Sequence, residues 1–144
     1  MPKPTRSSAL SLPPPVIALA QWLVPGLGYW LLGQRVRGWV VGLTILLLFI
    51  LGLLIGGIRV VDPPSMAGQG SFFSQIMQRP WFIGQVLNGL PGVVAAILGQ
   101  HFKMPVSTAR VNEIGTLYTA VAGMLNLMAI IDSSYRATLE ESES

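Results

Sequence analysis

Few side chains in this sequence could carry out chemistry, and they lie outside its long apolar runs. His101 is the only histidine, it lies between Gln100 and Lys103, and the chain has no cysteine. Without cysteines or a nearby carboxylate pair, one histidine cannot complete a usual zinc site. Lys103 and Ser107 have the spacing of a catalytic Ser/Lys pair on one helix, but Pro105 between them disfavours that helix. We therefore expect no catalytic residue, no metal or cofactor site, and no enzyme activity.

Several charged residues border the apolar runs. Asp132 and Arg136 are four residues apart, a spacing that favours an ion pair between successive turns of one helix. In the alternative arrangement, Asp132 pairs across a helix bundle with Arg35 or Arg37 and holds the ends of two helices together. In both cases these four residues are candidates for charge pairs at the interface between a membrane and water.

Composition indicates the surroundings in which these residues lie. Of the 144 residues, 51% are hydrophobic and 10% are charged, with a mean hydropathy of +0.60, whereas about 25% of the residues in a typical soluble protein are charged. We therefore expect one small integral membrane domain in contact with the lipid bilayer. The nine basic and six acidic residues are spread over many short segments, so no basic face marks a nucleic-acid partner.

Four apolar segments have the composition of membrane helices. They cover residues 16–33, 38–58, 81–99 and 114–132. The second is the clearest, because at about 1.5 Å per residue its length matches a hydrocarbon core of about 30 Å. The pattern predicts an all-α polytopic membrane protein, with about four transmembrane helices in a small bundle over residues 15–136. The Pro/Ser-rich tail of residues 1–14 and the acidic tail of residues 137–144 are expected to be disordered.

The first apolar segment contains helix-breaking residues within "PGLGYWLLGQR". The motif consists of Pro25, Gly26, Gly28 and Gly33. Proline removes a backbone donor and disfavours helix at the preceding residue, and glycine permits a sharp bend. We expect a first transmembrane helix that is broken at Pro25-Gly26, with Tyr29 and Trp30 at the level of the lipid headgroups. The alternative is a re-entrant hairpin that enters and leaves on one side, with its irregular backbone covered by protein.

Small and weakly polar residues gather on one side of the other three expected helices. At about 100° per residue they form a stripe on each. The expected helix-packing residues are Gly38, Gly42, Gly52, Gly56, Gly89, Gly92, Ala96, Gly115, Gly123 and Asn126. Helices in lipid associate through close backbone approach and interhelical hydrogen bonds, so we interpret these faces, with the two GxxxG pairs of the second segment, as packing surfaces. The alternative is a substrate path lined by Gln85, Asn88 and Asn126.

An internal match supports the idea of a duplicated unit. "PGLGYWLLGQR" begins at Pro25 and "PGVVAAILGQH" begins at Pro91, and the two stretches share five identical positions. Both precede a charged loop and a long apolar segment, so the chain either contains two copies of a unit of helix, Pro-Gly break and helix, or has acquired a short match by chance in Gly/Leu-rich sequence.

The stretch "PGLGYWLLGQRVRGWVVGL" resembles the "PGLGxxYxG…G" signature of TM2-like small membrane proteins. The matching positions are Pro25, Gly26, Gly28, Gly33 and Gly38. The resemblance covers residues 16–58 and implies two hydrophobic helices joined by a tight turn, with no common enzymatic activity. The sequence lacks the Asp-Arg-Phe motif of the better-known members, so a receptor-like role does not carry over. The fourth segment resembles the end of an uncharacterised bacterial family, which implies a location in the bacterial inner (cytoplasmic) membrane.

Two functions fit these features. The first is a small multi-pass membrane protein that acts as a non-catalytic structural or accessory subunit, packing through its Gly/Ala-rich helix faces against other membrane proteins or a second copy of itself. The alternative is a minimal oligomeric transporter or channel, because four short helices enclose little space alone.

Overall fold

The computed structural model describes residues 12–57, 60–61, 74, 80–101 and 109–142, and these residues form helices and turns without a strand. The helices are α1 (Pro14–Leu23), α2 (Leu27–Leu31), α3 (Arg35–Gly56), α5 (Pro80–Val86), α6 (Leu90–His101) and α7 (Ala109–Ser142). The prediction of an all-α fold is therefore confirmed for the described part of the chain. Residues 1–11 of the expected N-terminal tail lie outside the described residues.

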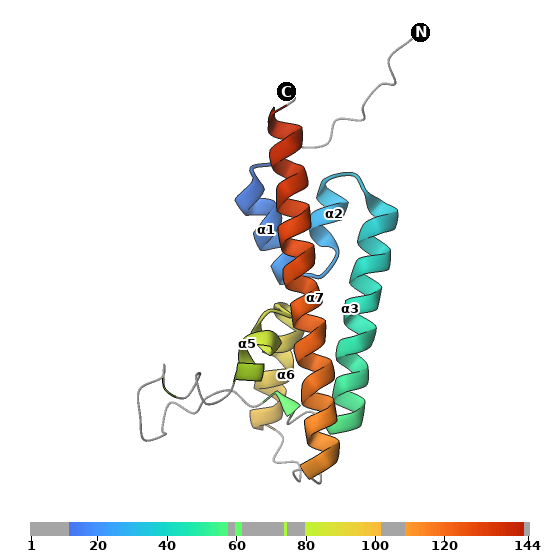
Figure 1. Cartoon of the computed structure of the whole chain (residues 1–144), viewed down its shortest axis with the longest axis vertical. Helices are drawn as coiled ribbons and strands as arrows, with labels where there is room; N and C mark the ends of the chain where they lie inside the picture. Colours follow the sequence, from blue (N-terminus) through green and yellow to red (C-terminus); the bar gives the residue numbers. More distant parts are fainter. Residues whose placement is uncertain (1–11, 58–59, 62–73, 75–79, 102–108, 143–144) are drawn as a thin grey trace.

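Two long helices, α3 and α7, lie side by side and run in opposite directions (Figure 1). Both are long and apolar enough to cross a membrane, so the four spans expected from the sequence are not confirmed. Their contact is close because glycines face each other: a Cβ added to Gly115 would lie 2.6 Å from the Cα of Gly56 and 2.7 Å from the carbonyl oxygen of Gly52. The 34 residues of α7 extend over about 51 Å at about 1.5 Å per residue.

Helices α1 and α2 form a short hairpin beside the C-terminal half of α7 (Figure 1). Helix α1 ends at Leu23, where the following Pro25 disfavours further helix. Gly26 has a φ of +95° and lies directly before α2, a conformation that residues with a side chain rarely adopt. The predicted break at Pro25-Gly26 is therefore confirmed, and it reverses the direction of the chain.

Helices α5 and α6 form a second hairpin beside the N-terminal half of α7 (Figure 1). The sequence predicts one apolar segment over residues 81–99 or, if the unit is duplicated, a break at Pro91-Gly92. The structure differs from both, because α5 ends at Val86 and α6 begins at Leu90. Asn88-Gly89 forms the turn, with Gly89 at a φ of +66°. Asn-Gly is a strong turn signal, and here it interrupts the apolar run.

The turns of the two hairpins meet near the middle of α7. A Cβ on Gly89 would collide with the carbonyl oxygen of Trp22, and the indole Nε1–H of Trp22 donates to the carbonyl oxygen of Val86 at 3.2 Å. Each hairpin leads to a long helix, and the second set of helices runs opposite to the first (Figure 1). The equivalent turn glycines are Gly26 and Gly89. The sequence match instead aligned Gly26 with Gly92, which lies inside α6, so that match does not align the two turns.

The core lies along one face of α7, where small and polar residues are buried. They are Thr119, Ala122, Asn126, Ala129, Ser133 and Ala137. Ala137 packs with Ile17 of α1 and Leu32 beyond α2. This packing lies within the tail that the sequence predicts to be disordered from residue 137, and the structure differs there, because α7 continues as a helix to Ser142.

Candidate functional site

Asn126, near the middle of α7, connects both hairpins. Its side-chain oxygen accepts a hydrogen bond from Gln21 Nε2 at 3.1 Å, and its Nδ2 donates to the carbonyl oxygen of Leu87 at 2.9 Å. Gln21 Oε1 in turn accepts from the backbone N–H of Gly28 at 3.0 Å. Leu87 and Gly28 lie where the hairpin helices end or begin, and such positions leave backbone groups without intrahelical partners. Two fully buried amide side chains therefore supply those partners.

The second hairpin contributes two more buried amides, which face Thr119 of α7. Gln85 Nε2 donates to the carbonyl oxygen of Val60 at 2.9 Å and to Thr119 Oγ1 at 3.0 Å. Asn88 Nδ2 donates to the carbonyl oxygen of Thr119 at 2.7 Å. Because carbonyl oxygens can only accept, these contacts determine which end of each amide carries the nitrogen.

Fixing the amide nitrogens leaves two oxygen atoms unpaired. Gln85 Oε1 and Asn88 Oδ1 are buried and have no hydrogen-bond partner among the residues that the structure describes. A buried acceptor without a partner costs about 1–3 kcal/mol, so this part of the core has hydrogen-bonding capacity that its own fold does not use. Gln85 also borders a mainly apolar cavity of about 240 Å³ between Val61, α5 and α6.

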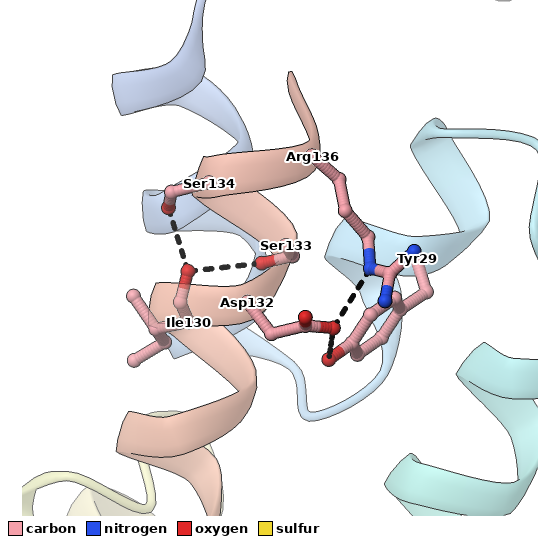
Figure 2. A network of polar contacts seen from close by, with 6 residues as sticks. All are labelled: Tyr29, Ile130, Asp132, Ser133, Ser134 and Arg136. Carbon is pink, nitrogen blue, oxygen red and sulfur yellow. Dashed lines mark hydrogen bonds and ion pairs between the residues drawn. The ribbon is translucent and has the colours of Figure 1, made fainter. Parts of the chain in front are cut away.

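A second polar cluster holds the first hairpin to α7 nearer its C-terminal end (Figure 2). The hydroxyl of Tyr29 donates to Asp132 Oδ2 at 2.8 Å, and Arg136 Nε lies 2.9 Å from the same oxygen. The predicted Asp132–Arg136 pair is therefore confirmed. The hydroxyls of Ser133 and Ser134 donate to the carbonyl oxygen of Ile130 (Figure 2), so they satisfy an acceptor of their own helix.

Arg35 and Arg37 do not reach Asp132, so the alternative pairing across the bundle is wrong. The guanidinium carbon of Arg37 lies 5.8 Å from the centre of the Tyr29 ring, and that of Arg35 lies 6.0 Å from the Trp30 ring. Tyr29 makes the cross-bundle contact instead. It is 3% exposed, which differs from the expectation that it lies among lipid headgroups.

The expected helix-packing glycines make contacts within the chain. Gly38 and Gly42 face the first hairpin at Gly26 and Pro25, and Gly123 faces the carbonyl of Gly84 in α5. The remaining members lie inside the fold as well: Gly52 and Gly56 against α7, Gly89 against α1, Gly92 against the end of α5, and Ala96 beside the core. Of the helix-break residues, Gly28 packs on Gln21, whereas no described residue other than its chain neighbours comes within 4 Å of a Cβ added to Gly33.

The residues first considered for chemistry stay apart from this core. His101 is exposed at the end of α6, and Lys103, Pro105 and Ser107 lie outside the described residues. No group of three or more His, Asp or Glu side chains in the described part of the chain could hold a metal ion. Sequence reasoning missed Gln21, although a signal was available: it is the only strongly polar residue between Val16 and Val24.

The chain belongs to a family described as "Family of unknown function (DUF6677)", whose model matches residues 16–143. No curated protein and no solved structure matches the chain. The resemblance to TM2-like proteins remains an expectation from the sequence.

Proposed function

We propose that this family member is an integral membrane protein that carries a small polar solute across the bilayer at the junction of its two hairpins. In this arrangement α3 and α7 cross the membrane, and the hairpins enter from opposite faces and meet in the middle. The observation that carries the proposal is the contact between the two hairpin turns beside Asn126 and the unpaired amide oxygens of Gln85 and Asn88.

Exposure of the long helices supports the membrane location. A core helix of a soluble protein is mostly buried. In the most apolar 18-residue stretch of each long helix, only 22% of α3 and 33% of α7 are buried. Large apolar side chains such as Leu54, Val36 and Met128 point outward. Such a surface is suited to lipid and would be costly in water.

The length of the hairpin helices supports re-entrant segments rather than further spans. Crossing a bilayer takes about 20 residues in one helix, whereas α1 has 10 and α5 has 7. Irregular backbone at membrane depth is tolerated where protein covers it. Here the Gln21 side chain accepts a hydrogen bond from the Gly28 N–H, and the Asn126 side chain donates one to the Leu87 carbonyl. Protein groups therefore pair with the irregular backbone of both hairpins.

The opposed hairpins support a transport role. Many transporters bind solutes near the midplane, where discontinuous helices of two inverted repeats meet. In the proposed orientation, amide groups of both hairpins and the Thr119 hydroxyl of α7 would lie at such a level, and the acceptors of Gln85 and Asn88 can receive N–H or O–H donors. A solute with such donors would replace hydrogen bonds that the fold leaves unmade.

The alternative of an accessory subunit has less support. It relied on glycine-rich faces for packing against a partner, and those glycines contact other parts of the same chain. Little of that surface is left for another protein.

Solute flux in proteoliposomes tests the proposal. We expect liposomes with the purified chain to take up at least one of glycerol, urea or ammonium faster than protein-free liposomes. Asn126→Leu should abolish the increase, whereas Met128→Leu, on the outer face of α7, should retain it. Rates equal to those of protein-free liposomes for all three solutes would contradict the proposal.

A further inference from the structure

An apolar groove runs along the outer side of the first hairpin. It has a volume of about 370 Å³ and lies between the hairpin turn, the first half of α3 and Pro91 of α6. Leu43 and Leu46 form its wall toward the middle of α3. Gly26, Gly38 and Gly42 line the groove where the hairpin turn and α3 are in close backbone contact.

Two tryptophans form one end of the groove. The rings of Trp30 and Trp39 meet edge to face with their centres 5.6 Å apart, and both residues line the groove. They are 41% and 63% exposed. Exposed tryptophans of this kind are typical of the level where lipid tails meet headgroups.

Two exposed arginines lie near this end of α3. The guanidinium of Arg35 lies over the ring of Trp30, which lines the groove, and that of Arg37 lies over the ring of Tyr29. Asp132, whose charge also acts on Arg37, forms its ion pair with Arg136. Within the described residues no carboxylate forms an ion pair with Arg35 or Arg37.

We propose that this groove binds an acyl chain of an anionic phospholipid, whose phosphate is held by Arg35 and Arg37. Guanidinium groups match phosphate oxygens with paired donors, and a neutral apolar groove ending in two cations is complementary to a lipid of negative charge. The inference rests on the membrane location proposed above but not on solute transport.

Native mass spectrometry of the full chain tests this site. The delipidated protein is mixed with equal amounts of phosphatidylglycerol and phosphatidylcholine that have the same acyl chains. Since each arginine near a lipid surface contributes about 1 kcal/mol toward anionic lipid, we expect the chain to prefer phosphatidylglycerol about 30-fold. Equal retention of both lipids would overturn the proposal.

Variants separate the groove from general surface charge. Arg35→Ala with Arg37→Ala should remove the preference, and Arg110→Ala, an exposed cation at the start of α7, is the matched control that should retain it. An equal effect of Arg110→Ala would overturn the site.

Leu46→Trp tests the acyl-chain part and does not depend on the arginine variants. It should lower retention of both lipids, whereas Leu47→Trp, at an exposed neighbouring position outside the groove, should not. Unchanged retention in Leu46→Trp, or a second copy of the chain bound in place of lipid, would overturn the proposal. Normal solute flux alongside lost lipid preference would leave the proposed function standing.

Discussion

The two hairpins share one plan but differ in how their buried polar groups are used. In each, a short helix ends, a glycine of positive φ reverses the chain, and a second helix leads toward a long one. In the first hairpin, both ends of the Gln21 amide are bonded. In the second, the oxygens of Gln85 and Asn88 have no partner among the described residues. The first hairpin therefore anchors on α7 through fully bonded amides, and the second has the acceptors that the proposed solute would use.

We expect the largest loss of stability from a substitution that breaks the contact between the two hairpin turns. Gly89→Ala should destabilise the protein by more than about 4 kcal/mol, because the added Cβ meets the rigid carbonyl of Trp22 in addition to the strain at positive φ. Gly33→Ala is the matched control, since Gly33 also has a positive φ but its added Cβ would meet no other part of the described chain within 4 Å, and it should cost only about 1–2 kcal/mol. Thermal unfolding in detergent measures both, and equal losses would mean that the turns do not touch.

A smaller effect is expected when the link between the hairpins and α7 is removed. Asn126→Leu leaves Gln21 Nε2 and the Leu87 carbonyl unpaired, and should cost about 2–3 kcal/mol. A double-mutant cycle with Gln21→Leu should give a coupling of about 0.6–1.7 kcal/mol. Additive losses would show that the two amides do not interact.

Tyr29→Phe tests the second contact that holds the first hairpin to α7, the hydrogen bond from Tyr29 to Asp132. It removes the hydrogen bond to Asp132, which stays paired with Arg136, so we expect a loss of about 1–2 kcal/mol. Tyr135→Phe is the control, because Tyr135 is 63% exposed and should tolerate the change. If the two variants unfold at the same temperature, the Tyr29 contact contributes nothing.

We expect the smallest loss of stability from a substitution in the second hairpin. This substitution compares the buried amides of the two hairpins directly. Gln85→Leu loses two donated hydrogen bonds but also removes an unpaired acceptor, so its net cost should be about 0–1 kcal/mol. Gln21→Leu, which loses two bonds and relieves nothing, should cost more. The opposite order in urea or detergent unfolding would show that the hairpins do not differ in this way.

Sequence reasoning predicted local features better than the contacts between distant segments. The helix break at Pro25 could be predicted because proline disfavours helix, and the spacing of Asp132 and Arg136 predicted their ion pair. The turn at Asn88-Gly89 was missed because apolar residues surround it on both sides.

The remaining features depend on long-range packing that no local pattern contains. Gly89 could be placed on a helix face but not opposite Trp22, its actual neighbour. The helix beyond residue 137 is held by contacts of Ala137 with Ile17 and Leu32, more than 100 residues earlier in the sequence. Composition alone indicates an acidic, polar end.

Labelling of single cysteines from one side of the membrane tests the opposed hairpins most directly, since the natural chain has no cysteine. Cysteines replace Pro13, Gln34, His101 and Ser142, one at a time, and a membrane-impermeant thiol reagent is added to intact cells. We expect positions 13, 34 and 142 to share one side and position 101 to lie on the other. Labelling of positions 13 and 34 from opposite sides would mean that the first segment crosses the bilayer, and would contradict the account.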